Sequence, residues 1–159
     1  MGDFAADPDV LSLIVCDQII TDRVTGKVSL IGMFAAVHSP RFPVTHPQIC
    51  VYVALTEGRG KTPITIRIVD ANEARKAIVE GKGVVEFKDP RMIANLALQF
   101  HGLRFPEPGQ YRVQIWSGSS LLREARLHLL KAKMPPRPPG RPGSPPPSED
   151  PPAPEDTGV

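Results

Sequence analysis

The sequence has few of the residues from which metal centres and disulfide frameworks are built. Its 159 residues include two cysteines, Cys16 and Cys50, and a single tryptophan. Two cysteines without a paired spacing exclude the usual cysteine-rich zinc motifs. Each cysteine lies in an apolar, strand-like run, and no export signal precedes it, so we expect both thiols to be buried and reduced.

Signals for export and for membrane insertion are also missing. Residues 1–10 carry three aspartates and no basic side chain, unlike the basic start of a secretory signal. No apolar run approaches the roughly 20 residues that a membrane-spanning helix needs. We therefore expect a cytoplasmic protein with no membrane partner.

Charge of one sign is not in excess. The formal net charge is +2, although residues 134–159 carry two arginines against four acidic residues, which leaves +4 for the rest. This charge falls well short of the basic footprint of a dedicated nucleic-acid binder. The composition therefore disfavours nucleic acid as a partner.

Proline and glycine are abundant, and their distribution divides the chain. The sequence has 19 prolines and 13 glycines, and residues 134–159 hold eleven of the prolines. That segment has too few large apolar side chains to offset the entropy of ordering it. We expect a short N-terminal arm over residues 1–10, one folded domain over 11–132, and a disordered proline-rich tail over 133–159.

The folded part shows the period-two alternation of β-strands. Eight short runs have this pattern or the β-branched content of a buried strand, and turn residues separate them. They cover residues 11–20, 27–38, 48–56, 64–69, 77–87, 94–103, 111–116 and 121–130. This spacing predicts an all-β fold, an antiparallel Greek-key sandwich of about seven or eight strands. Short helices remain alternatives for residues 94–103 and 121–127.

Several connections have specific expectations. Asp22 and Gly26 should close a tight turn between the first two strands, and Gly32 should mark a bulge or a close backbone contact. Residues 39–47 contain three prolines and should form a long crossing loop. The two glycines inside residues 77–87 predict an irregular strand with a bulge.

The turn before Tyr111 is the most informative stretch. Residues 104–111 read Arg-Phe-Pro-Glu-Pro-Gly-Gln-Tyr, and a strand with Tyr111, Val113 and Ile115 on one face follows. A proline-glycine turn that leads into such a strand is typical of the penultimate strand of a β-sandwich. We expect the aromatic ring to close the bottom of the core.

The sequence contains no recognisable catalytic set. His38 and His46 flank one loop, where Asp17 or Asp70 could join them, and these four residues are the basis for an alternative function as a hydrolase or metal-dependent enzyme. Asp17 shares its strand parity with apolar residues, so its carboxylate should be hydrogen-bonded, to turn amides or to an arginine. We predict no cofactor and no metal.

Two candidate binding features remain. Arg67, Arg112 and Trp116 should lie on an outer sheet face, where the arginines would be solvated and an outward tryptophan would hint at a binding patch. A basic nucleic-acid surface is the alternative for this face. In the tail, Pro136 and Pro139 form a P-x-x-P spacing, and Lys133 places a positive charge three residues before its first proline; polyproline-binding grooves recognise such segments.

Three segments resemble an uncharacterised bacterial family of short β-sandwich proteins. They are residues 13–34, which begin Leu-Ile-Val-Cys-Asp-Gln-Ile-Ile, residues 42–56 with His46-Pro47, and the 105–111 turn. The resemblance spans about residues 11–130. It implies the sandwich fold and no activity, so it assigns no functional residue.

The function that fits these observations is a non-enzymatic interaction module. A β-sandwich commonly carries binding loops and faces on a rigid scaffold, although a fold alone does not assign a function. We expect a protein partner, with the tail adding reach or a second contact. The sequence leaves the partner's identity and the oligomeric state open.

Overall fold

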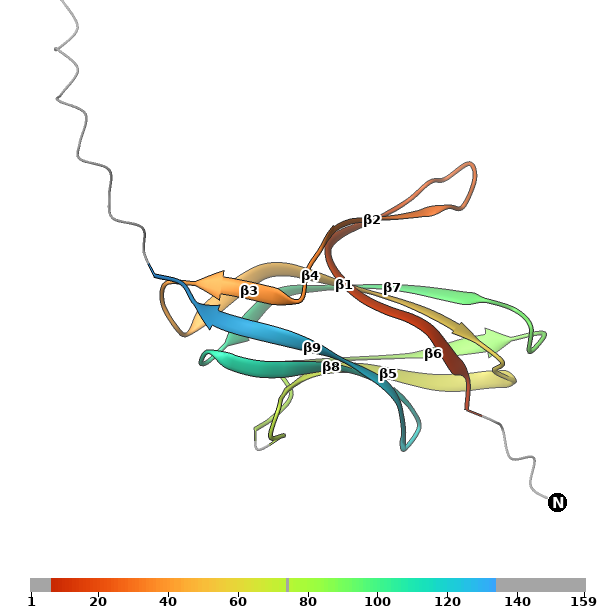
Figure 1. The fold of residues 1–159 in the computed structure, drawn as a ribbon. Helices are drawn as coiled ribbons and strands as arrows, with labels where there is room; N and C mark the ends of the chain where they lie inside the picture. The colour runs from red at the N-terminus through yellow and green to blue at the C-terminus, as the bar shows by residue number, and fades with distance from the viewer. Residues whose placement is uncertain (1–6, 74, 134–159) are drawn as a thin grey trace, which may run out of the picture.

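The computed structural model describes residues 7–73 and 75–133, and these form a two-sheet β-sandwich (Figure 1). Nine strands make up the described part of the chain. They are β1 (Asp9–Thr21), β2 (Val28–Met33), β3 (Ala36–Ser39), β4 (Val44–Thr56), β5 (Gly60–Asp70), β6 (Val79–Phe87), β7 (Ala94–Phe105), β8 (Gly109–Ser117) and β9 (Ser120–Lys131). None of these residues forms a helix that could cross a membrane.

The strands form two sheets, and consecutive strands either pair as a hairpin or cross to the other sheet, as expected of the predicted Greek-key sandwich. One sheet has the order β2-β1-β4-β7 and the other β3-β9-β8-β5-β6. The pairs are antiparallel with one exception, because β3 runs parallel to β9. Both segments for which a short helix was the alternative, β7 and the first half of β9, are strands.

The core lies between the two sheets and follows the predicted alternation. On β4, the side chains of Ile49, Val51, Val53 and Leu55 are buried and belong to the core cluster. Ile64, Ile66 and Ile68 of β5 lie in the same cluster. Burying one such aliphatic side chain contributes about 1.5–3 kcal/mol, so these alternating positions dominate the stability of the fold.

The prediction of one strand over residues 27–38 was wrong. The chain leaves the four-stranded sheet after Met33 and enters the other sheet as β3, which pairs with His128–Lys131 of β9. This crossing raises the number of strands from the expected seven or eight to nine. A continuous run of strand-forming residues does not show where the chain changes sheets, because a strand of either sheet has the same alternation of inward and outward side chains.

The expected crossing loop over residues 39–47 is also shorter than predicted. β4 already begins at Val44 and contains Pro47. Proline lacks a backbone N–H, so it needs a position where a strand has no neighbour on one side. Pro47 has such a position, because β1 pairs with β4 only from Cys50 onward.

Residues 77–87 form a more regular strand than the glycines predicted. β6 pairs with β5 over nine consecutive positions without a register shift, so the expected bulge is absent from this pair. The glycines instead occupy inward positions of an edge strand.

The predicted turn before β8 forms a tyrosine corner. The Tyr111 hydroxyl donates a hydrogen bond of 2.9 Å to the Glu107 carbonyl, four residues earlier. The Tyr111 ring packs edge to face against Phe105, with 5.0 Å between the ring centroids. Both side chains are buried, so the ring closes the core as expected.

Residues 17–33 form a projecting hairpin, made of the second half of β1, the turn and β2 (Figure 1). β1 pairs with β4 as far as Cys16 and with β2 from Cys16 to Thr21. Beyond Cys16 the two strands therefore have only each other as neighbours in the sheet. β4 continues past this point in its pairing with β7, whereas the hairpin diverges from β4 and extends away from the sandwich.

Candidate functional site

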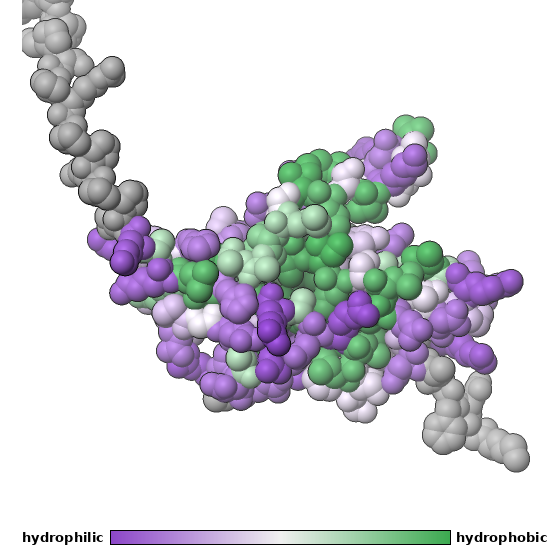
Figure 2. All heavy atoms as spheres, viewed as in Figure 1, coloured by the Kyte–Doolittle hydropathy of each residue, from purple (hydrophilic) through white to green (hydrophobic). Residues whose placement is uncertain are grey.

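The projecting hairpin exposes large apolar side chains. Val24 at its tip is 94% exposed and Met33 at its base is 67% exposed, and Ile20 and Ile31 are also exposed. Figure 2 shows apolar residues over the hairpin and over the part of the body beneath it. Sequence analysis missed this surface, because the same run of strand formers is expected of a buried strand.

Both faces of the hairpin are apolar. The strand register places Ile20, Ile31 and Met33 on one face, whereas Ile19, Val28 and Leu30 lie on the other, where they are half-buried. An ordinary surface hairpin has one apolar face against the core and one polar face in water. This hairpin therefore presents more apolar surface than its own sandwich covers.

The turn of the hairpin is built as the sequence predicted. The Asp22 carboxylate accepts hydrogen bonds from the backbone N–H groups of Val24 (2.7 Å) and Thr25 (2.9 Å). The Thr25 and Val24 amides lower the pKa of Asp22 below its usual value. Gly26 has a φ of +68°, a conformation that glycine adopts without strain. The turn is thus held by local bonds that need no contact with the body.

Gly32 lies against Asp17 across the base of the hairpin. Its φ is +66°, and a Cβ atom at this position would collide with the Asp17 carboxylate. The sequence predicted a bulge or a close backbone contact here, and the structure instead brings the Asp17 side chain close to the Gly32 backbone. Glycine at position 32 therefore permits both the positive φ angle and the close approach of the Asp17 side chain from β1.

A hollow of about 410 Å³ at the base of the hairpin brings together three of the four residues of the alternative enzyme hypothesis. Asp17, His38 and His46 line it, whereas Asp70 lies at the end of β5 in the other sheet and does not. Among the described residues, no group of three or more histidine, cysteine, aspartate or glutamate side chains is arranged to hold a metal ion. The hollow therefore gathers both histidines and one of the two candidate carboxylates, in an arrangement that does not match a metal site among the described residues.

The expectation for Asp17 was wrong. Its side chain is exposed, and none of the hydrogen bonds found between described residues ends on its carboxylate. Only its backbone carbonyl is used, as the acceptor for Gln48 Nε2 at 3.0 Å and for the Cys50 thiol at 3.4 Å. The reason is that β1 leaves the body at Asp17, so the face that bears Leu13 and Val15 no longer covers the core there.

His46 has one buried ring nitrogen, Nδ1, without a hydrogen-bond partner in the described structure. Its ring stacks on Phe34, with 5.8 Å between centroids and 25° between planes. The ring thus fills the gap between β4 and the segment that joins β2 to β3. This contact indicates a packing role for His46.

Arg67 and Trp116 lie together on the outer face of the five-stranded sheet, as predicted. The Arg67 guanidinium stacks over the Trp116 ring at 4.5 Å from its centroid. Both side chains donate to the same acceptor, Gln114 Oε1, Arg67 Nε at 2.9 Å and Trp116 Nε1 at 3.1 Å. Gln114 is only 1% exposed, so this network holds the tryptophan in place.

The expectation that both arginines are solvated holds only in part. Arg67 and Arg112 are half-buried, and Arg112 pairs with Glu124 at 3.3 Å. The Gln114 amide completes the network by donating to Glu73 at 2.8 Å and to Glu124 at 3.3 Å. Because acidic groups already engage these cations or the amide between them, the face is a satisfied polar surface with little excess positive charge.

The tail motif falls largely outside the described part of the chain. Lys133 is the last described residue and is exposed, whereas Pro136 and Pro139 lie outside the described residues. The motif remains a prediction from sequence.

Cys16 and Cys50 face each other across β1 and β4. They are register partners in the four-stranded sheet, and both are free and buried, at 0% and 2% exposure. Burial raises the pKa of the Cys16 thiol, and the neighbouring Cys50 adds to this effect. Such a thiol is a poor nucleophile at neutral pH.

Comparison with solved structures finds distant likenesses to three β-glucosidases. One is a β-glucosidase of Erythrobacter marinus, which is 17% identical to this chain in sequence and has a TM-score of 0.41. The match covers 61% of this chain and 14% of the β-glucosidase. A β-glucosidase of Listeria innocua in complex with isofagomine is 11% identical, with a TM-score of 0.40, and the match covers 77% of this chain and 16% of that chain. A β-glucosidase of Kluyveromyces marxianus is 16% identical, with a TM-score of 0.35, and the match covers 65% of this chain and 17% of that chain.

These likenesses carry no argument about activity, because the TM-scores are low and the matched segment is less than a fifth of each enzyme. No curated protein matches the chain. A family model does match, over residues 11–130, which include all but the ends of β1 and β9. The chain therefore belongs to the family of unknown function DUF6941.

Proposed function

We propose that this domain is a non-enzymatic protein-interaction module and that the projecting hairpin is its interface with a second copy of the chain. The observation that carries the proposal is a two-stranded hairpin outside the sandwich with apolar side chains on both faces. An isolated two-stranded hairpin is at best marginally stable in water. Contact with a partner would cover these side chains and stabilise the hairpin.

The free edge of β2 favours a second copy as the partner. Val28–Met33 reads Val-Ser-Leu-Ile-Gly-Met, with neither a charge nor a proline, and among the described residues β2 pairs only with β1. Natural edge strands usually carry lysine, proline or bulges that prevent pairing with another chain, and β2 has none of these in its six residues. Two β2 strands could therefore pair antiparallel about a two-fold axis and continue the sheet.

Charge also permits this pairing. Residues 17–33 carry Asp17 and Asp22 against Arg23 and Lys27, so the hairpin has no net charge. An uncharged apolar surface is complementary to itself, whereas a charged one would repel its own copy. Because the proposed contact needs no oppositely charged partner, an identical hairpin can supply it.

The experiment is a measurement of mass in solution by light scattering, on the full-length chain at micromolar concentration. The wild-type chain should have twice the mass of one chain. Ile31→Lys should have the mass of one chain, because it places a charge on the pairing strand. The matched control is Leu121→Lys, which changes an equally exposed leucine (43%, against 47% for Ile31) at the start of β9 and should leave the dimer intact.

A monomeric wild-type chain would refute the second copy as partner. Loss of the dimer in both variants would instead show that any added lysine prevents association, and would refute the hairpin as interface. Far-ultraviolet circular dichroism of each variant checks that the sandwich has formed.

A further inference from the structure

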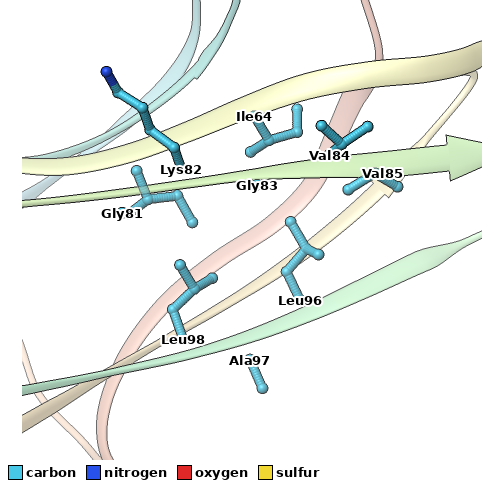
Figure 3. A pocket seen from close by; sticks show the side chains of 10 residues that line it. Ile64, Gly81, Lys82, Gly83, Val84, Val85, Leu96, Ala97 and Leu98 are labelled. Carbon is cyan, nitrogen blue, oxygen red and sulfur yellow. The ribbon is translucent and has the colours of Figure 1, made fainter.

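A small apolar cavity opens between the two sheets at the side opposite the hairpin. It has a volume of about 170 Å³ and lies between the edge strands β6 and β7 (Figure 3). Ile64 and Ile66 of β5 close it on one side, and Leu96 and Leu98 of β7 point toward β6 from the other. The lining is therefore aliphatic on both sheets.

The cavity exists because two inward positions of β6 have no side chain. Val79, Gly81, Gly83, Val85 and Phe87 share the inward face of this strand, and the two glycines lie in its middle. A Cβ atom at Gly83 would meet no atom within 4 Å, whereas one at Gly81 would lie 3.1 Å from the Phe100 ring. The space beside Gly83 is thus open, whereas the Phe100 ring lies close to Gly81.

A free metabolite would fit this cavity poorly. Small-molecule sites usually exceed about 300 Å³ and have a few polar groups that orient the ligand. This cavity is smaller, and its one charged neighbour, Lys82, points away from it and pairs with Glu80 at 2.8 Å. A dry apolar cavity of about 150 Å³ holds one benzene-sized group. One large apolar side chain therefore matches both its size and its lining.

The polar groups beside the cavity belong to the edge of the sheet. Within the described part of the chain β6 pairs with β5 alone, so half of its backbone N–H and C=O groups face away from the sheet. An extended peptide that pairs with this edge would project alternate side chains toward β7. Those side chains could enter the cavity beside Gly81 and Gly83, where β6 has no side chains to fill the space between the sheets.

We propose that the free edge of β6 binds an extended segment of a partner protein and that one large apolar side chain of this segment enters the cavity. The backbone pairing supplies general affinity, and the cavity supplies selectivity for leucine, methionine or phenylalanine at one position. The 134–159 segment of this chain does not suit the edge, because eleven prolines cannot donate to the pairing.

This site is independent of the hairpin interface. β2 and β3 are the edges on one side of the sandwich, and β6 and β7 are the edges on the other. A dimer joined through the hairpins would leave both β6 edges free, and such a dimer could bind two segments of one partner with increased avidity.

The test begins with selection of random nine-residue displayed peptides on the immobilised full-length chain. Selected peptides should share one large apolar residue at a fixed position among strand-forming neighbours. A selected peptide, made synthetically, should bind about tenfold or more weakly when that residue is replaced by serine, because the burial of a large apolar side chain is lost. A version N-methylated at alternate backbone positions should also lose binding, because it cannot pair with the edge.

The matched variants are Gly83→Val and Glu86→Val. Both add a valine to β6, but position 83 faces the cavity whereas Glu86 is exposed on the outer face. Gly83→Val should fold at least as stably as wild type, because it fills empty space and replaces a glycine within a strand. It should bind the selected peptides about tenfold or more weakly, whereas Glu86→Val should bind them like wild type.

Two outcomes would overturn the proposal. One is that no peptide with a shared apolar position is selected on wild type over Gly83→Val. The other is that the synthetic peptide binds Gly83→Val as tightly as wild type, which would place the contact elsewhere. Thermal unfolding of both variants shows that a loss of binding is not a loss of fold.

Discussion

The Tyr111 hydroxyl donates a 2.9 Å hydrogen bond to the Glu107 carbonyl, which ties the start of β8 to the turn before it. Tyr111 is among the largest fully buried side chains of the domain. The bond therefore joins the core to the connection between the two sheets. Its loss should be measurable without disturbing the packing of the ring.

Tyr111→Phe should lower the free energy of unfolding by about 1 kcal/mol, the usual net value of one hydrogen bond. Urea unfolding followed by circular dichroism measures this difference. Tyr52→Phe is the matched control, because its hydroxyl bonds to Asn95 at 2.9 Å in an exposed position. A cost at Tyr111 no larger than at Tyr52 would contradict a structural role for the corner.

Gly32→Ala should destabilise the protein more than Gly26→Ala. The φ angle is +68° at Gly26 and +66° at Gly32, so alanine at either position costs about 1 kcal/mol in backbone strain. A Cβ at Gly26 meets nothing within 4 Å, whereas a Cβ at Gly32 collides with the Asp17 side chain. The comparison of the two variants isolates the steric contribution of Asp17.

A double-mutant cycle completes this test. Asp17→Gly should restore part of the stability of Gly32→Ala, because it removes the side chain with which the new Cβ collides. Urea unfolding of the four proteins measures the coupling. Equal costs for Gly26→Ala and Gly32→Ala would mean that the close approach of Asp17 has no energetic effect.

Stability should fall at alkaline pH, in part through Cys16. Burial raises the pKa of its thiol, so the folded protein holds this proton more tightly than the unfolded chain does. The resulting stability is fully present below the pH at which an unfolded cysteine ionises, about 8.5, and is lost as pH rises through the higher pKa of the folded state. The raised pKa of Tyr111, caused mainly by burial, acts in the same direction at higher pH.

The measurement is the urea midpoint between about pH 7 and about pH 10, a range that spans the ionisation of an unfolded cysteine. Cys16→Ala should lose less stability over this range than wild type, whatever its stability at neutral pH. Parallel curves for the two proteins would exclude a contribution from Cys16.

Trp116 should report on the outer-face network, because it is the single tryptophan of the chain. Arg67→Ala removes the cation that stacks over the ring and one of the two donors to Gln114 Oε1. The fluorescence emission of Trp116 should shift to longer wavelength as its ring gains contact with water. Arg104→Ala, an exposed arginine on β7, is the control and should leave the emission unchanged. An unchanged emission in Arg67→Ala would mean that the stacking does not shield the ring.

Local patterns in the sequence were sufficient to predict many elements of the fold. Alternation at Ile64, Ile66 and Ile68 predicted which face of β5 is buried, and the turn before Tyr111 predicted the start of β8. Asp22 and Gly26 predicted the hairpin turn, because side-chain acceptors and a positive φ act within a few residues. These features depend on neighbours in the chain, which the sequence shows directly.

The candidate sites were less predictable. Arg67 and Trp116 were placed on one face by strand parity, but the buried Gln114 that joins them depends on β5 and β8 being neighbours. Asp17 was expected on a buried face and is exposed, because β1 leaves β4 after Cys16 and pairs from there on with β2. The cavity beside Gly83 exists only because Leu96 and Leu98 lie opposite in the other sheet.

The sequence by itself determined the all-β class, the buried face of most strands and the turns that separate them, because alternation and turn chemistry act over short distances along the chain. Only the tertiary structure decided where the chain changes sheets, which edges stay open and which apolar side chains stay uncovered. Those features depend on contacts between residues far apart in the sequence. For example, β2 ends at Met33 in one sheet, and β3 begins at Ala36 in the other sheet, where it pairs with His128 of β9. A side chain that suits a strand is the same whether a second sheet covers it or not.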